Sequence, residues 1–219
     1  MSELITLNSK VDDAPFAALH LQPKGQRRGG LILLHEIFGL APDIHVDAAR
    51  WAAMGFEVLA PSLFDRQEPD YVADRDSESI AAGRAMAAAN GLDNPIDDAE
   101  TCLDFLRPRG PVFLLGYCYG GSLAWLAACR LGDLAAASGY YGSMIHNHAH
   151  ETPKVPVMLH FGTEDPGIPV AQVEGIRRAQ PDVPVHLYDA GHGFNREDGA
   201  AAHLARRRTL EFFERNGAA

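Results

Sequence analysis

This sequence has few cysteines, few cations and no long apolar run. Its three cysteines, Cys102, Cys118 and Cys129, are an odd number in a chain of 219 residues, and the opening segment MSELITLNSK has no basic stretch followed by an apolar one. These features argue against a disulfide-rich secreted scaffold, and we expect reduced thiols in a cytoplasmic protein. No apolar run approaches the roughly 20 residues that a membrane-spanning helix needs, so no membrane partner is expected.

The shortage of cations restricts the class of partner. Lysine and arginine total 19 against 29 aspartates and glutamates, which gives a formal net charge of −10. Nucleic acids and anionic membranes both bind through clustered cations, so neither is expected as a general partner. We expect a small-molecule partner and a monomer or weak homo-oligomer. Apolar residues make up 47% of the chain, enough for a core that needs no disulfide or metal.

Short apolar runs alternate with longer amphipathic stretches, and no linker or repeat divides them, so residues 1–219 are predicted to form a single domain. The predicted strands are 16–21, 30–35, 56–60, 111–115, 135–139, 155–161 and 185–188. The predicted helices are 43–54, 77–89, 95–106, 121–131, 170–179 and 200–213. Continuously apolar strands alternating with helices indicate an α/β fold with a mainly parallel sheet, flanked by helices. Sites in such folds lie at the carboxyl ends of the strands.

The segment GYCYGG at 116–121 follows one predicted strand and precedes a helix. A glycine two residues before and two residues after Cys118 is typical of the tight turn that exposes the nucleophile in α/β-hydrolases. The following helix would favour a thiolate, because its amide dipoles point toward the sulfur. A buried structural cysteine is the alternative, and we prefer that interpretation for Cys102 and Cys129, which lie within helical patterns.

A cysteine nucleophile needs a base and a group that orients the base. Asp165 and His192 each follow a predicted strand, in the order nucleophile, acid, histidine that α/β-hydrolases use. The flanking glycines of His192 leave its imidazole accessible. A helix-capping role for Asp165 and a surface position for His192 are the alternatives, and Glu164 is the neighbour most easily confused with Asp165.

The segment HEIFG at 35–39 follows the strand at 30–35. In hydrolases this loop supplies one backbone N–H of the oxyanion hole, so we assign that donor to Ile37 and the second to Tyr119. Glu36 then lies near the nucleophile, where it could accept the thiol proton or pair with a nearby cation.

HEIFG, GYCYGG, the GYYG run at 139–142 and AGHGF at 190–194 resemble the dienelactone hydrolase family over most of the chain. The resemblance implies an α/β-hydrolase sheet of seven or eight strands without a large cap domain. It implies a triad of Cys118, Asp165 and His192, with Glu36 interacting with the resting thiol until substrate displaces it. It also implies two arginines for a substrate carboxylate: Arg196, and either Arg84 or Arg75. We also assign Tyr140 to substrate binding.

The activity implied by the resemblance is cofactor-free hydrolysis of 4-carboxymethylenebut-2-en-4-olide, a dienelactone, to maleylacetate through an acyl-thioester, in chloroaromatic degradation. A generalist carboxylesterase or thioesterase on the same triad is one alternative. A non-enzymatic thiol switch is another, because a reactive cysteine is also sensitive to oxidation. His146, His148 and His150 form an H-x-H-x-H pattern, but in a predicted loop, so no metal site is expected.

Overall fold

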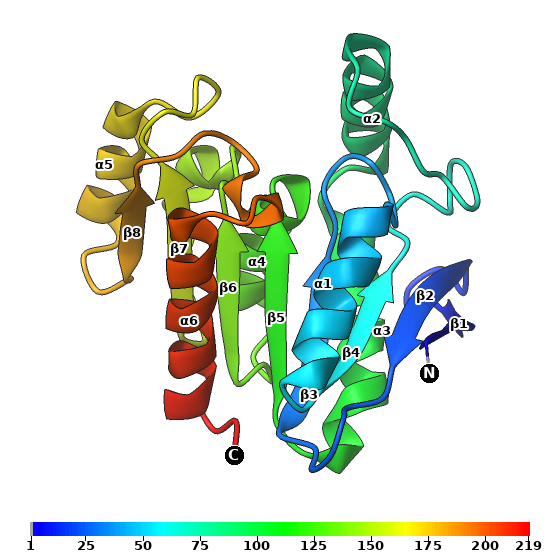
Figure 1. The fold of residues 1–219 in the computed structure, drawn as a ribbon. Helices are drawn as coiled ribbons and strands as arrows, with labels where there is room; N and C mark the ends of the chain where they lie inside the picture. The colour runs from blue at the N-terminus through cyan, green and yellow to red at the C-terminus, as the bar shows by residue number, and fades with distance from the viewer. Residues whose placement is uncertain (1) are drawn as a thin grey trace.

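The computed structural model describes residues 2–219, and an eight-stranded sheet organises them (Figure 1). The strand order is β1-β2-β4-β3-β5-β6-β7-β8. Strands β1, β2 and β4 pair antiparallel, and all other neighbours pair parallel. The strands are β1 (Ser2–Asn8), β2 (Pro15–Leu21), β3 (Gly29–Leu34), β4 (Phe56–Pro61), β5 (Val112–Tyr117), β6 (Ala136–Tyr140), β7 (Val157–Gly162) and β8 (Val185–Tyr188).

Helices cover both faces of this sheet (Figure 1). On one face, α1 and α6 meet through Trp51 and Phe213, whose ring centroids lie 6.0 Å apart. On the other face, α3 and α4 pack against the central strands. The helices are α1 (Pro42–Ala53), α2 (Ser77–Asn90), α3 (Asp93–Leu106), α4 (Tyr119–Arg130), α5 (Val170–Ala179) and α6 (Ala200–Arg215), with short 3-10 turns η1 (Arg107–Arg109), η2 (Ile145–His148) and η3 (Phe194–Arg196).

This double cover explains the sequence pattern of the central strands. Every residue of β3, β4, β5, β6 and β7 is buried, so these strands are mostly apolar instead of alternating, with Glu57, Ser138 and His160 as buried polar exceptions. The predicted α/β-hydrolase fold, a mainly parallel sheet flanked by helices, is confirmed. No helix among residues 2–219 is both long and apolar enough to cross a bilayer.

The predicted elements differ from the observed ones mainly at the N-terminus. Strand β1 was not predicted; it is an edge strand whose seven residues are exposed or half-buried, so its apolar signal is weak. Helix α4 begins at Tyr119 instead of residue 121, directly after the turn that contains Cys118.

The carboxyl ends of the parallel strands share one edge of the sheet, where the chain leaves β3, β5, β7 and β8. Helix α2 lies beyond this edge and outside both helix layers (Figure 1). The loops that follow β3, β5, β7 and β8 lie along this edge, and the candidate site lies between these loops and α2.

Candidate active site

Cys118 lies in a strained turn between β5 and α4. Its backbone has φ 54° and ψ −109°, a conformation that an L-residue rarely adopts. The turn also requires glycine on both sides: a Cβ at Gly116 would lie 1.9 Å from the Gly120 carbonyl oxygen, and one at Gly120 would lie 2.3 Å from the Leu34 oxygen. The sequence thus places its cysteine where the amide dipoles of α4 begin.

The other two cysteines lie in the hydrophobic core. Burial raises the pKa of the Cys129 thiol to about 12 and that of Cys102 well above its ordinary value. Only Cys118 is half-exposed, and it lines the cavity described below. Of the three thiols, Cys118 alone is accessible to a ligand of this cavity.

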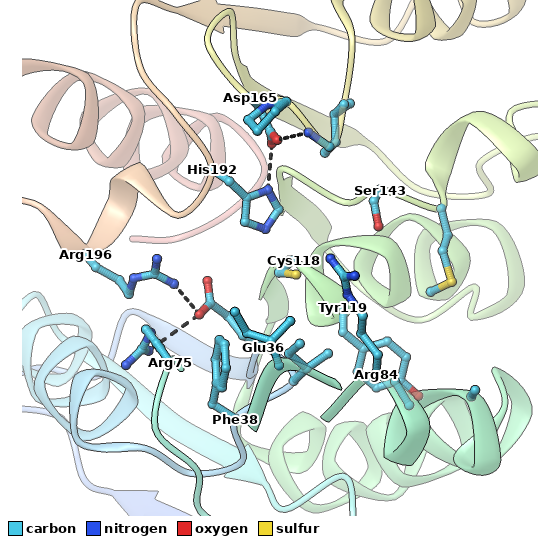
Figure 2. A pocket seen from close by; sticks show the side chains of 18 residues that line it. Glu36, Phe38, Arg75, Arg84, Cys118, Tyr119, Ser143, Asp165, His192 and Arg196 are labelled. Atoms are coloured by element: carbon cyan, nitrogen blue, oxygen red, sulfur yellow. Dashed lines mark hydrogen bonds and ion pairs between the residues drawn. The ribbon is translucent and has the colours of Figure 1, made fainter. Parts of the chain in front are cut away.

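His192 and Asp165 meet at the carboxyl ends of β8 and β7. Nδ1 of His192 lies 2.6 Å from Oδ2 of Asp165, whose Oδ1 accepts the Gly167 N–H at 2.8 Å (Figure 2). Burial alone would raise the pKa of Asp165, but the hydrogen bond with His192 and the backbone N–H donors outweigh it and hold the pKa low. The neighbouring Glu164 is exposed, so the carboxylate at His192 is that of Asp165.

The imidazole of His192 faces both a carboxylate and a thiol. Burial alone would lower its pKa, but the hydrogen bonds with Asp165 and Cys118 raise the pKa to about 10. The structure therefore brings Cys118, His192 and Asp165 together, with His192 between the thiol and the carboxylate. Such an arrangement can take a proton from the thiol and hold it.

The two predicted oxyanion donors, Ile37 and Tyr119, both line the same cavity as Cys118. The peptide that carries the Ile37 N–H is held by His35, whose Nδ1 lies 2.5 Å from the Glu36 carbonyl oxygen. Because Leu63 N–H donates to Nε2 of His35 at 3.0 Å, the ring proton is on Nδ1. Burial lowers the pKa of His35 to about 4, so the ring stays neutral and keeps this tautomer.

His35 is a functional candidate that the sequence reasoning missed. It was quoted as part of HEIFG without a role, although a histidine at the end of a buried strand was a usable signal. His35 does not line the cavity, and it acts on the site only by holding the Glu36–Ile37 peptide.

The carboxylate of Glu36 is buried beside two arginines and a tyrosine (Figure 2). Oε2 pairs with Nη1 of Arg196 and lies 3.5 Å from Nη2 of Arg75. Oε1 accepts the Tyr141 hydroxyl at 3.2 Å. Within residues 2–219 no hydrogen bond joins Glu36 to Cys118, so the expected resting contact with the thiol is absent. The Glu36 carboxylate pairs with Arg196 and Arg75 instead.

The three arginines considered for substrate binding, Arg196, Arg75 and Arg84, lie at different parts of the cavity. Arg196 is not a surface residue paired with its neighbours Glu197 or Asp198, because it is paired with Glu36. Arg75 lies beside Arg196, whereas Arg84 lies across Cys118 from them, near Tyr119 (Figure 2). Both Arg75 and Arg84 line the cavity, but only Arg75 shares a carboxylate oxygen with Arg196.

The assignment of Tyr140 to substrate binding is wrong. Tyr140 is the last residue of β6, only 2% exposed, and its hydroxyl bonds to Thr209 of α6 at 2.7 Å, away from the cavity. The next residue, Tyr141, has φ 37°, and its hydroxyl bonds to Glu36 and Asn195. Strand β6 ends at Tyr140 and the chain turns at Tyr141, so the two hydroxyls reach different partners.

The candidate residues surround one cavity of about 710 Å³. One part of its wall is polar and contains the triad residues and arginines already described. The apolar part of the wall comes from α2 and the loops after β3, β6 and β7, and includes Phe38, Ile80, Ala87, Ala88, Met144, Pro166 and Ile168. Residues 2–219 contain no cluster of three or more histidines, cysteines or acidic side chains arranged to hold a metal ion.

The sheet order and the strained turn after the central strand β5 define an α/β-hydrolase. The chain belongs to the dienelactone hydrolase family, whose model matches residues 16–217. It is accordingly a hydrolase that acts on ester or lactone bonds.

Relatives of known name agree with this assignment. The chain is 29% identical to a carboxymethylenebutenolidase of Pseudomonas putida over 228 aligned residues, covering 97% of this chain and 96% of that protein. It is 30% identical to the carboxymethylenebutenolidase of Pseudomonas sp. strain P51, with 90% and 89% coverage.

Solved structures show the same fold. A Klebsiella pneumoniae protein assigned as a dienelactone hydrolase superposes with a TM-score of 0.83 at 23% identity, over 98% of this chain and 99% of that one. A dienelactone hydrolase-like promiscuous phosphotriesterase from metagenomic libraries superposes with a TM-score of 0.74 at 20% identity, over 98% of each chain.

Proposed function

We propose that this protein hydrolyses a carboxylate-bearing lactone of the dienelactone type through an acyl-thioester on Cys118. The observation that carries the proposal is the half-exposed thiol at a strained turn, facing a histidine that a buried aspartate holds at 2.6 Å. The family and the named relatives support the class of reaction. The thioester and the substrate are inferred from the chemistry of the site.

The reaction proceeds in two half-reactions. His192 accepts the thiol proton, and the Cys118 sulfur attacks the lactone carbonyl carbon, whose oxygen becomes negative and is stabilised by the N–H groups of Ile37 and Tyr119. The C–O bond of the ring breaks, and the leaving oxygen takes the proton from His192. Water, deprotonated by His192, then attacks the thioester carbonyl and releases the acid and the thiol.

Arg196 and Arg75 are the groups we assign to the substrate carboxylate. Their shared partner Glu36 is already a carboxylate, so an incoming one competes for the same guanidinium donors. A net charge of −10 makes such local cations necessary for an anionic substrate. Arg84, the other arginine predicted for the carboxylate, lines the same cavity but does not share Glu36 with Arg196.

Replacing Arg196 with alanine is expected to raise KM for the dienelactone by one to two powers of ten, about 1.5–3 kcal/mol, because one charge-assisted hydrogen bond is lost. Hydrolysis of the neutral ester p-nitrophenyl acetate should be nearly unchanged. Steady-state kinetics on both substrates measure the difference. Arg196 also packs over Gly193, next to His192, so equal losses on the two substrates would assign it to the loop instead.

Replacing Glu36 with glutamine is expected to speed alkylation of Cys118 by iodoacetamide at neutral pH several-fold. Removing the carboxylate removes a negative charge from a buried site and leaves Arg196 uncompensated, and both changes favour a thiolate nearby. Asp43→Asn is the matched control, because Asp43 also pairs with Arg75, at 2.7 Å, without lining the cavity. Identical alkylation rates across the pH range would leave Glu36 a structural role only.

Turnover of 4-carboxymethylenebut-2-en-4-olide to maleylacetate, compared with p-nitrophenyl acetate, tests the proposal directly. A strong preference for the dienelactone is expected. Similar kcat/KM values for the dienelactone and for small esters would favour the generalist esterase. The apolar part of the cavity wall also suits such substrates. A thiol switch would need a second cysteine within reach, and Cys102 and Cys129 are both buried in the core.

A further inference from the structure

Gly83 of helix α2 packs against Ile37, which lies in the loop after β3. A Cβ at Gly83 would lie 2.3 Å from the Ile37 carbonyl oxygen and 3.1 Å from the Ile37 Cβ. Contacts that short do not occur between real Cβ atoms and backbone, so only glycine lets the helix sit this close. Gly83 is buried, although most of α2 is exposed.

Helix formation does not explain this glycine. The sequence of α2, SESIAAGRAMAAAN, holds six alanines, and glycine inside a helix is less favourable than alanine by about 1 kcal/mol. The residues on the same side of α2, Ile80, Arg84 and Ala87, line the cavity. Gly83 therefore lies at the centre of the helix face that is turned toward the site.

Ile37 is held from its other side as well. His35 fixes the peptide before it through the Glu36 carbonyl, and the Phe38 carbonyl after it accepts the Ala73 N–H at 3.2 Å. Ile37 is thus held by hydrogen bonds to the carbonyls of the residues before and after it, and Gly83 packs directly against its own carbonyl.

We propose that Gly83 is a positioning residue for the reaction: its contact with Ile37 sets where the Ile37 N–H meets the oxyanion and where the α2 wall of the cavity lies. The inference rests on the proposed function, since it concerns the donor that stabilises the tetrahedral intermediate. A methyl group at position 83 has to push Ile37 or α2 away by roughly 1 Å, a displacement that can cost up to about 100-fold in rate when it affects a reacting geometry.

Gly83→Ala tests the proposal. We expect kcat for the dienelactone to fall about 10- to 100-fold, with a smaller change in KM. Alkylation of Cys118 by iodoacetamide should keep its rate and pH profile, because that displacement forms no oxyanion. The melting temperature should fall modestly, because the new methyl group overpacks against a backbone oxygen, while the fold is retained.

Two variants serve as controls. Gly175→Ala makes the same change inside α5, where the nearest atom to the new Cβ is 3.8 Å away, and should leave kcat unchanged. Ala82→Gly, at an exposed position of α2, loosens the helix without touching Ile37 and should lower kcat much less than Gly83→Ala does.

Wild-type kcat in Gly83→Ala, an equal loss in Ala82→Gly, or loss of the whole fold in Gly83→Ala would each overturn the inference. These outcomes are separate from failure of the proposed function, which would appear as Cys118-independent turnover in the wild-type background. A protein that requires Cys118 but tolerates Gly83→Ala would refute the positioning role alone.

Discussion

Replacing Cys118 with alanine is expected to reduce turnover of the dienelactone by about 10⁴-fold or more, the scale seen when a nucleophile is removed from a catalytic triad. Without the sulfur no acyl-thioester forms, and only the oxyanion donors and the bound geometry remain to assist water. The measurement is kcat/KM with the purified variant, together with its melting temperature. The fold should survive, because alanine is smaller and the half-exposed side chain lies only at the margin of the core.

The chain provides matched controls for this substitution. Cys102→Ala and Cys129→Ala remove thiols that are buried in α3 and α4 and should retain activity, with at most a modest loss of stability. Cys118→Ser should be a poor enzyme, because a hydroxyl is much harder to deprotonate than a thiol. Near-wild-type turnover in Cys118→Ala would refute the thioester mechanism.

Replacing Asp165 with asparagine is expected to lower kcat by up to about 10⁴-fold, because the amide no longer holds the imidazole in the required tautomer. With Asp165 in place the pKa of His192 is about 10, so the imidazolium persists well above neutral pH. Loss of the carboxylate lowers this pKa, so the imidazolium is lost at a lower pH. Alkylation of Cys118 at pH 7 should slow accordingly, and its pH profile should shift.

Glu164→Gln is the control for Asp165→Asn. It neutralises the adjacent carboxylate, which is exposed, and should leave both kcat and the alkylation profile unchanged. If Glu164→Gln lost as much activity as Asp165→Asn, the loss would come from disturbing the loop after β7 and not from losing the hydrogen bond between Asp165 and His192.

The sequence by itself was enough to predict the fold class and the strand ends at which Cys118, Asp165 and His192 lie. Apolar runs and helical stretches are short-range patterns, and seven of the eight strands follow from them because those strands are mostly apolar and largely buried. The nucleophile turn was predictable for the same reason: Gly116, Cys118 and Gly120 are close in sequence, and their spacing encodes one local conformation.

Only the tertiary structure decided which side chains face one another across the site. Tyr140 and Tyr141 are adjacent in sequence, yet one reaches Thr209 and the other Glu36, because the strand ends between them. The choice between Arg75 and Arg84 as the neighbour of Arg196 depends on how α2 and the segment before it lie over the sheet edge.

The contact of Gly83 with Ile37 and the pairing of Glu36 with Arg196 join residues that are 46 and 160 positions apart. No local pattern encodes such contacts, since they depend on the packing of whole elements. Edge strand β1 is the corresponding case in the fold itself: its exposed side chains leave little apolar signal, and its position follows from backbone pairing with β2. The sequence alone thus determined the fold class and the candidate groups, and packing determined which side chains those groups contact.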